Sequence, residues 1–82
     1  MLDDVLQKID EAQVDPALPR RVKTTLTHVK DELKKIKKES PDWNVKVTTL
    51  VYELEGVSSD VNIPMHAKTF IWNIISDLEA LT

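Results

Sequence analysis

The fold is decided by residues 62–81, which read NIPMHAKTFIWNIISDLEAL. This is the most apolar part of the chain, and its apolar side chains recur with helical spacing. At about 100° per residue, one face of this helix carries a core-type stripe. The stripe consists of Ala67, Phe70, Ile71, Ile74, Leu78 and Leu81. Pro64 suits the first helical turn, where its missing N–H has no helical partner, so the helix is expected to begin there.

A second set of apolar residues in the same helix lies beside the stripe. Met65, Trp72 and Ile75 project to one flank, so apolar surface extends past the core face. Either a neighbouring helix covers them, or they form an exposed contact site of the kind in which Trp and Met are enriched. The candidate interface consists of these three residues, joined by Tyr52 and Val45, which sit seven apart on the outer side of the preceding helix.

Three further helices are expected upstream, over residues 2–12, 19–38 and 41–55. Pro16 and Pro19 separate the first from the second, because proline breaks a continuing helix. Each helix carries its own apolar stripe. The stripes are Leu2, Val5, Leu6 and Ile9; Val22, Leu26, Val29, Leu33 and Ile36; and Trp43, Val47, Leu50, Val51 and Leu54.

Two local signals bound the third helix. Ser40 is placed to cap its start, with Pro41 at the first helical position. Gly56, the only glycine, is expected to take the left-handed conformation that closes the helix. Residues 57–62 would then form the longest loop.

Composition narrows the class of protein. A chain of 82 residues is a single domain, with an expected stability of about 4–12 kcal/mol. There is no cysteine for a disulfide or thiolate zinc site, and no apolar run of the ~20 residues that cross a bilayer. The acidic start is the reverse of a secretory signal, so a cytoplasmic protein without membrane contact is expected. The net charge of −3 argues against general nucleic-acid binding but allows a local basic face.

The sequence overlays itself when shifted by 45 residues. Asp15, Leu18, Pro19, Lys23 and Thr24 then meet Asp60, Ile63, Pro64, Lys68 and Thr69. Any two amphipathic helices agree at apolar positions, but the shared Asp-x-x-(Leu/Ile)-Pro-x-x-x-Lys-Thr pattern favours a duplication. The expected fold is all-α: a four-helix up-and-down bundle made of two pseudo-symmetric αα-hairpins, residues 1–38 and 41–82.

The residues that catalysis would need are missing from the pattern. The two histidines, His28 and His66, do not follow a glutamate at the spacing of di-metal bundles, and both are expected at the surface. No serine sits in a nucleophile elbow, and one glycine cannot build a phosphate loop. We therefore expect that the protein is not an enzyme and that it binds no cofactor, metal or small-molecule substrate.

Lysines gather along one flank of the second helix. They are Lys23, Lys30, Lys34 and Lys37, with Lys38 adjacent. Such a row could follow phosphates and would make binding strongly salt-dependent. No aromatic residue is interleaved for base stacking, and nearby acids dilute the field, so a solvated helix end is the competing interpretation.

The segment from Asp60 to Ile75 resembles the hallmark stretch of a small archaeal family known only as an uncharacterised protein family, number one-four-seven of its series. The resemblance is carried by Pro64, His66, Ala67, Lys68, Thr69, Ile71 and Trp72, and more loosely by residues 18–20. It implies a short archaeal helical-bundle protein and no assigned activity. Together with the apolar flank, the sequence favours a non-catalytic helical interaction module that self-associates or docks on a protein partner. The alternative is a nucleic-acid or ribonucleoprotein accessory protein that uses the lysines.

Overall fold

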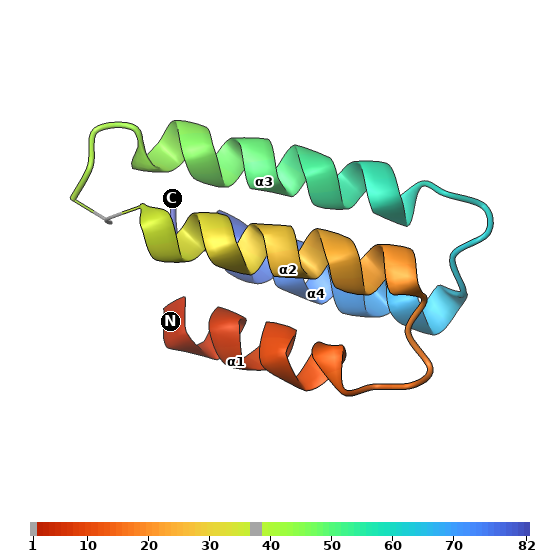
Figure 1. Cartoon of the computed structure of the whole chain (residues 1–82). Helices are drawn as coiled ribbons and strands as arrows, with labels where there is room; N and C mark the ends of the chain where they lie inside the picture. Colours follow the sequence, from red (N-terminus) through yellow and green to blue (C-terminus); the bar gives the residue numbers. More distant parts are fainter. Residues whose placement is uncertain (1, 37–38) are drawn as a thin grey trace.

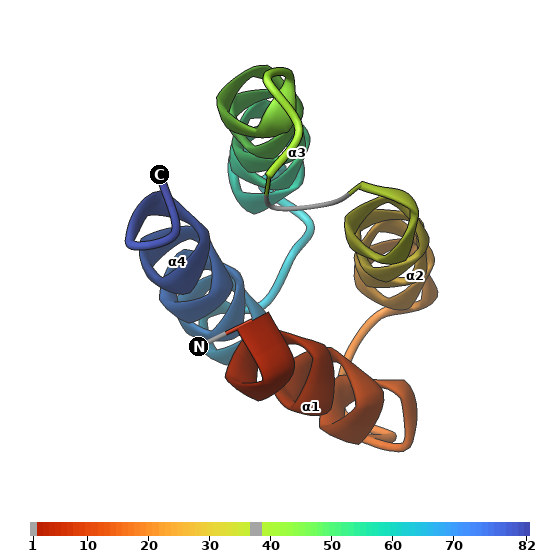
Figure 2. The ribbon, with the colours of Figure 1, turned by 90° about the vertical axis from the view of Figure 1, so that its left-hand side faces the viewer.

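The computed structural model describes residues 2–36 and 39–82, which form four antiparallel helices (Figure 1). The helices are α1 (Leu2–Gln13), α2 (Arg20–Lys35), α3 (Trp43–Ser58) and α4 (Met65–Glu79). Seen end-on they occupy the corners of a square in chain order, so α4 packs on both α3 and α1 (Figure 2). The described residues contain no strand. The predicted all-α four-helix bundle is confirmed.

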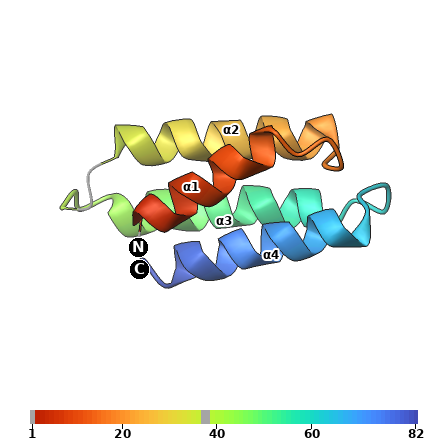
Figure 3. The ribbon, with the colours of Figure 1, turned by 90° about the horizontal axis from the view of Figure 1, so that it is seen from below.

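The chain ends and the three connections are divided between the two ends of the bundle (Figure 3). The N- and C-termini lie at the same end, beside the α2–α3 connection, and the α1–α2 and α3–α4 turns lie at the other end (Figure 3). His66 Nε2 lies 3.0 Å from the carbonyl oxygen of Ala17 and so links the start of α4 to the α1–α2 turn. Over the residues that the structure describes, no helix is long and apolar enough to cross a membrane.

One apolar stripe from each helix forms the core. The largest fully buried side chains are Val5 and Ile9 of α1, Val22, Leu26, Val29 and Leu33 of α2, Val47 and Leu54 of α3, and Ile71, Ile74 and Leu78 of α4. These positions match the stripes expected from the 3.6-residue period. Phe70 differs, because it is only partly buried and packs at the margin of the core.

Two similar turns lead into α2 and α4. In each, an aspartate Oδ1 accepts a hydrogen bond from the backbone N–H two residues on, at 2.8 Å for Asp15 and 2.9 Å for Asp60. Each chain segment then enters its helix at a proline with extended backbone, with φ and ψ of −60° and 151° at Pro19 and −62° and 154° at Pro64. Both prolines therefore stand one residue before the helix rather than at its first position.

Replacing Asp60 with alanine is expected to cost more stability than replacing Asp15. Asp60 holds its turn with Oδ1 and pairs with Arg21 of α2 through Oδ2, whereas Asp15 holds only its turn. We expect losses of about 1–2 kcal/mol for Asp60→Ala and about 0.5–1 kcal/mol for Asp15→Ala. Urea unfolding of the two variants measures both values. A larger loss at Asp15 would contradict this account of the turns.

The end predicted for α3 is wrong. The helix does not stop at Glu55 but continues through Gly56 to Ser58, and no described glycine has a positive φ. The physical reason is burial: Val57 lies three residues after Leu54 on the core face and is only 6% exposed. A further helical turn buries this side chain. The Ser59 N–H completes the end by donating to the Glu55 carbonyl at 3.1 Å.

Gly56→Ala is expected to stabilise the isolated chain by about 0.5–1 kcal/mol, because glycine is a poor helix former. A Cβ added at this position meets nothing within 4 Å. Thermal unfolding at low protein concentration would show a raised midpoint. A left-handed Gly56 would give the opposite result, since alanine is strained at positive φ.

The boundaries between α2 and α3 also differ from the sequence-based expectation. α2 ends at Lys35, and Ile36 has extended backbone as its C-cap. The predicted end at Lys38 lies outside the described residues, as does Lys37. Asp42, not Ser40, precedes α3 as N-cap, and it makes no side-chain capping bond. The Ser40 hydroxyl instead accepts the Asp42 N–H at 3.4 Å, within the turn before the helix.

Candidate functional site

The outward-facing side of α3 carries no charge. Five exposed residues cover an arc of about 100° on this side of the helix. We call them the outer strip of α3: Val45, Thr48, Thr49, Tyr52 and Gly56. The corresponding side of α2 is charged, with Arg20, Thr24, Thr27, Asp31, Lys34 and Lys35 exposed. A helix that faces water normally carries charged residues on that side, and the outer strip of α3 has none.

Trp72 of α4 lies level with Tyr52 of the outer strip. The Trp43 indole N–H donates to the Leu81 carbonyl at 3.2 Å, and this bond fixes the heights of antiparallel α3 and α4. Nine residues onward from Trp43 is Tyr52, and nine residues back from Leu81 is Trp72. The two aromatic side chains are 66% and 50% exposed, respectively. Tyr52 also lines a groove between the two helices, together with Val51, Glu55 and Glu79.

The structure divides the predicted interface residues into two groups. Met65, Trp72, Tyr52 and Val45 are exposed, whereas Ile75 is 7% exposed and belongs to the core. Ile75 is therefore covered by its neighbours and is not part of an exposed contact site. Val45 and Met65 each lie seven residues from the Tyr52–Trp72 pair along their own helices, which is about 10 Å. The exposed residues thus form a diagonal band across α3 and α4 rather than one compact cluster.

Sequence reasoning missed three members of this surface, namely Thr48, Thr49 and Gly56. None of these residue types by itself indicates a contact surface, and the sequence places Gly56 at a helix end. The signal that could have found them is the missing charge: a helical wheel of residues 43–58 already shows an arc without Asp, Glu, Lys or Arg.

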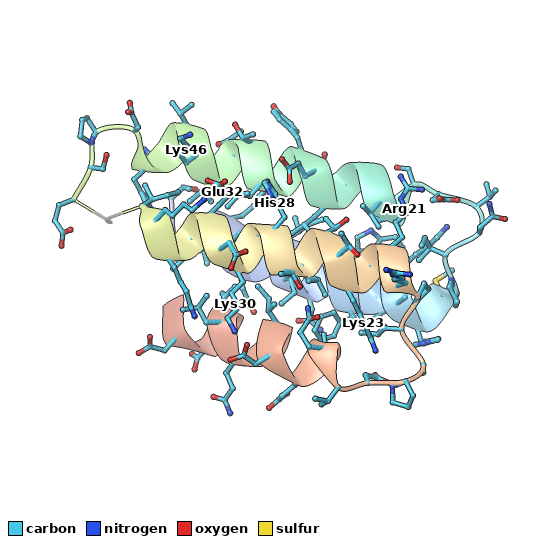
Figure 4. All side chains as sticks on the ribbon, viewed as in Figure 1. Arg21, Lys23, His28, Lys30, Glu32 and Lys46 are labelled. Carbon is cyan, nitrogen blue, oxygen red and sulfur yellow. The ribbon has the colours of Figure 1, made fainter. Side chains whose placement is uncertain are left out.

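Two lysines of α2, Lys23 and Lys30, lie on its flank toward α1 (Figure 4). Lys30 forms an ion pair with Asp10 of α1. Lys23 is half-buried, and its backbone carbonyl accepts a hydrogen bond from the side-chain amide of Gln13. Lys34 is exposed. The row expected from the sequence therefore includes a lysine that is already held by an acidic residue.

A polar groove separates α2 from α3. His28 Nε2 lies 3.3 Å from Glu53 Oε2, and Glu32 and Lys46 line the same groove (Figure 4). His28 and His66 are both exposed, as expected from the sequence. Within residues 2–36 and 39–82, no three His, Asp or Glu side chains are placed to hold a metal ion. Nothing in this geometry indicates catalysis.

Four antiparallel helices around one apolar core place the chain among the small all-α bundle proteins. Residues 1–81 match the model of the uncharacterised protein family UPF0147, and the chain belongs to this family. A UPF0147 protein of Archaeoglobus fulgidus is 32% identical over 81 residues, which cover 99% of this chain and 88% of the relative. A UPF0147 protein of Methanocaldococcus jannaschii is 32% identical over 79 residues, covering 96% and 82%.

Solved structures agree with the fold. A crystal structure of a UPF0147 protein from Thermoplasma acidophilum superposes with a TM-score of 0.85 at 27% identity, and the match covers 99% of this chain and 92% of that one. A crystal structure of a protein of unknown function, MMP1188, superposes with a TM-score of 0.79 at 27% identity, covering 99% and 89%. The family resemblance expected from the Pro64–Trp72 motif is confirmed, and the family is one without an assigned activity.

Proposed function

We propose that this protein is a non-catalytic helical interaction module whose contact surface is the outer side of the α3/α4 pair. The observation that supports this most is the uncharged outer strip of α3 with half-exposed Trp72 beside it. Contact surfaces are depleted of charge at their centre and enriched in Tyr, Trp and Met. The exposed residues of this band fit that composition.

Most of the binding free energy of this surface is expected to come from burial of its two aromatic side chains. Tyr and Trp bury about 150–250 Å² each when fully covered. More than half of Tyr52 and half of Trp72 remain exposed. At about 25 cal/mol per Å², covering the remainder contributes about 2–4 kcal/mol for each ring. Two such residues at the centre of a patch are enough to anchor a modest interface.

A photo-reactive amino acid placed at position 72 or 52 tests the proposal. The full chain carrying it is irradiated in native extract, and the purified chain is irradiated at concentrations up to about 1 mM. A discrete covalent adduct of defined mass is expected from both positions. The matched control is position 27, because Thr27 is exposed on the charged outer side of α2. Absence of adducts from positions 52 and 72, or the same adducts from position 27, would rule out this surface.

A further inference from the structure

Two opposite charges border the outer strip of α3 on its flank toward α2. Lys46 and Glu53 lie seven residues, or about two helical turns, apart. Glu53 uses Oε2 in its contact with His28, which leaves Oε1 available to a further donor. Among the described residues, no ion pair of the structure involves Lys46, which is exposed. This flank therefore presents a positive group at one end and a carboxylate oxygen at the other.

We propose that a second copy of this chain covers the outer strip, so that two α3 helices pack antiparallel about a two-fold axis. This inference rests on the proposed function, and it names the partner at that same surface. In an antiparallel pair made by a two-fold axis, each flank meets the same flank of the other copy with the chain direction reversed. Lys46 of each copy then faces Glu53 of the other, and two ion pairs form.

The register that aligns these charges also fits the rest of the strip. It places the two-fold axis between Thr49 and Leu50, since these positions are midway between Lys46 and Glu53. On the other flank, Asn44 of one copy comes level with Glu55 of the other. A parallel pairing would instead set Glu53 beside Glu55 of the other copy, and like charges would repel. Charge complementarity therefore favours the antiparallel arrangement.

Gly56 gives an independent reason for close packing at this surface. Glycine weakens a helix, and within one chain the space around the missing Gly56 side chain is open. In the antiparallel register, Gly56 comes within two residues of the level of Val45 of the other copy. The Val45 side chain can pack there directly on the Gly56 backbone of the other copy, because glycine has no side chain in the way. The glycine therefore has a packing role only in the pair.

The size of the strip sets the expected strength of the pair. α3 has 16 residues and is about 24 Å long, so one side of it buries less than the ~800 Å² per partner of a standard interface. The dimer is therefore expected to be weak and reversible. Its assembly should appear only as the protein concentration is raised.

Sedimentation equilibrium on the full chain and on charge-reversed variants tests the pairing. The wild-type mass is expected to rise toward that of a dimer between about 10 μM and about 1 mM. Lys46→Glu and Glu53→Lys should each raise the concentration needed for dimerisation by about tenfold or more. The double variant restores both ion pairs with reversed sign and should return to wild-type behaviour. A mixture of the two single variants should form mixed dimers for the same reason.

Two controls separate this pairing from other effects. Glu53→Lys also removes the contact with His28, so His28→Gln must dimerise as the wild type does; far-UV circular dichroism checks that each variant is helical. A wild-type chain that stays monomeric at every concentration, or a double variant that does not recover, overturns the pairing. Adducts from positions 52 and 72 to a different protein would then still support the proposed function, whereas no adducts and no dimer would reject both.

Discussion

Trp43→Ala is expected to lower the free energy of unfolding by about 3–5 kcal/mol. Trp43 begins α3, is 5% exposed, and its indole N–H donates to the buried carbonyl of Leu81. Alanine leaves a cavity between α3 and the end of α4 and also leaves that carbonyl without its donor. The loss is a large share of a total stability of about 4–12 kcal/mol. Urea unfolding followed by circular dichroism measures it.

Two matched variants assign this loss to its causes. Trp43→Phe keeps an aromatic ring but not the donor, so a smaller loss of about 1–2 kcal/mol is expected. Trp72→Ala removes the other tryptophan from a site where half of the ring is already exposed, so at low concentration a smaller loss of about 1–2 kcal/mol is expected. Equal losses for Trp43→Ala and Trp72→Ala would contradict the packing of α3 on α4.

Ile71→Ala is expected to destabilise the chain by about 2–5 kcal/mol. Ile71 is fully buried on the core face of α4, where neighbouring helices leave no solvent to fill the space that the truncation creates. The matched control is Asn73→Ala on the exposed side of the same helix, which should change stability by less than about 0.5 kcal/mol. A urea midpoint for Ile71→Ala close to that of Asn73→Ala would show that the core is assigned to the wrong face of α4.

The number of helices and their core faces could be predicted because each stripe is a local pattern. Val22, Leu26, Val29 and Leu33 repeat at three and four residues, and all four are buried. The end of α3 could not be predicted in this way. Glycine is a local stop signal, but burial of Val57 from the neighbouring helices outweighs the cost of one glycine inside a helix.

The candidate surface was only half visible in the sequence. Ile75 and Trp72 both lie at the edge of the stripe, and only the position of the neighbouring helix determines which of them is covered. The level of Tyr52 against Trp72 follows from the Trp43–Leu81 hydrogen bond, which no spacing rule predicts. The same holds for the ion pairs between helices, such as Lys8 with Asp77 at 2.5 Å and Lys30 with Asp10.

Disulfide trapping measures most directly whether a second copy covers the outer strip. The natural chain has no cysteine, so Thr49→Cys introduces a single thiol next to the proposed two-fold axis. A disulfide needs Cα atoms within about 7 Å, which only residues near the axis reach. Under mild oxidation we expect Thr49→Cys to form covalent dimers at least about tenfold faster than Thr27→Cys on the charged side of α2. Equal rates for the two variants would contradict the account.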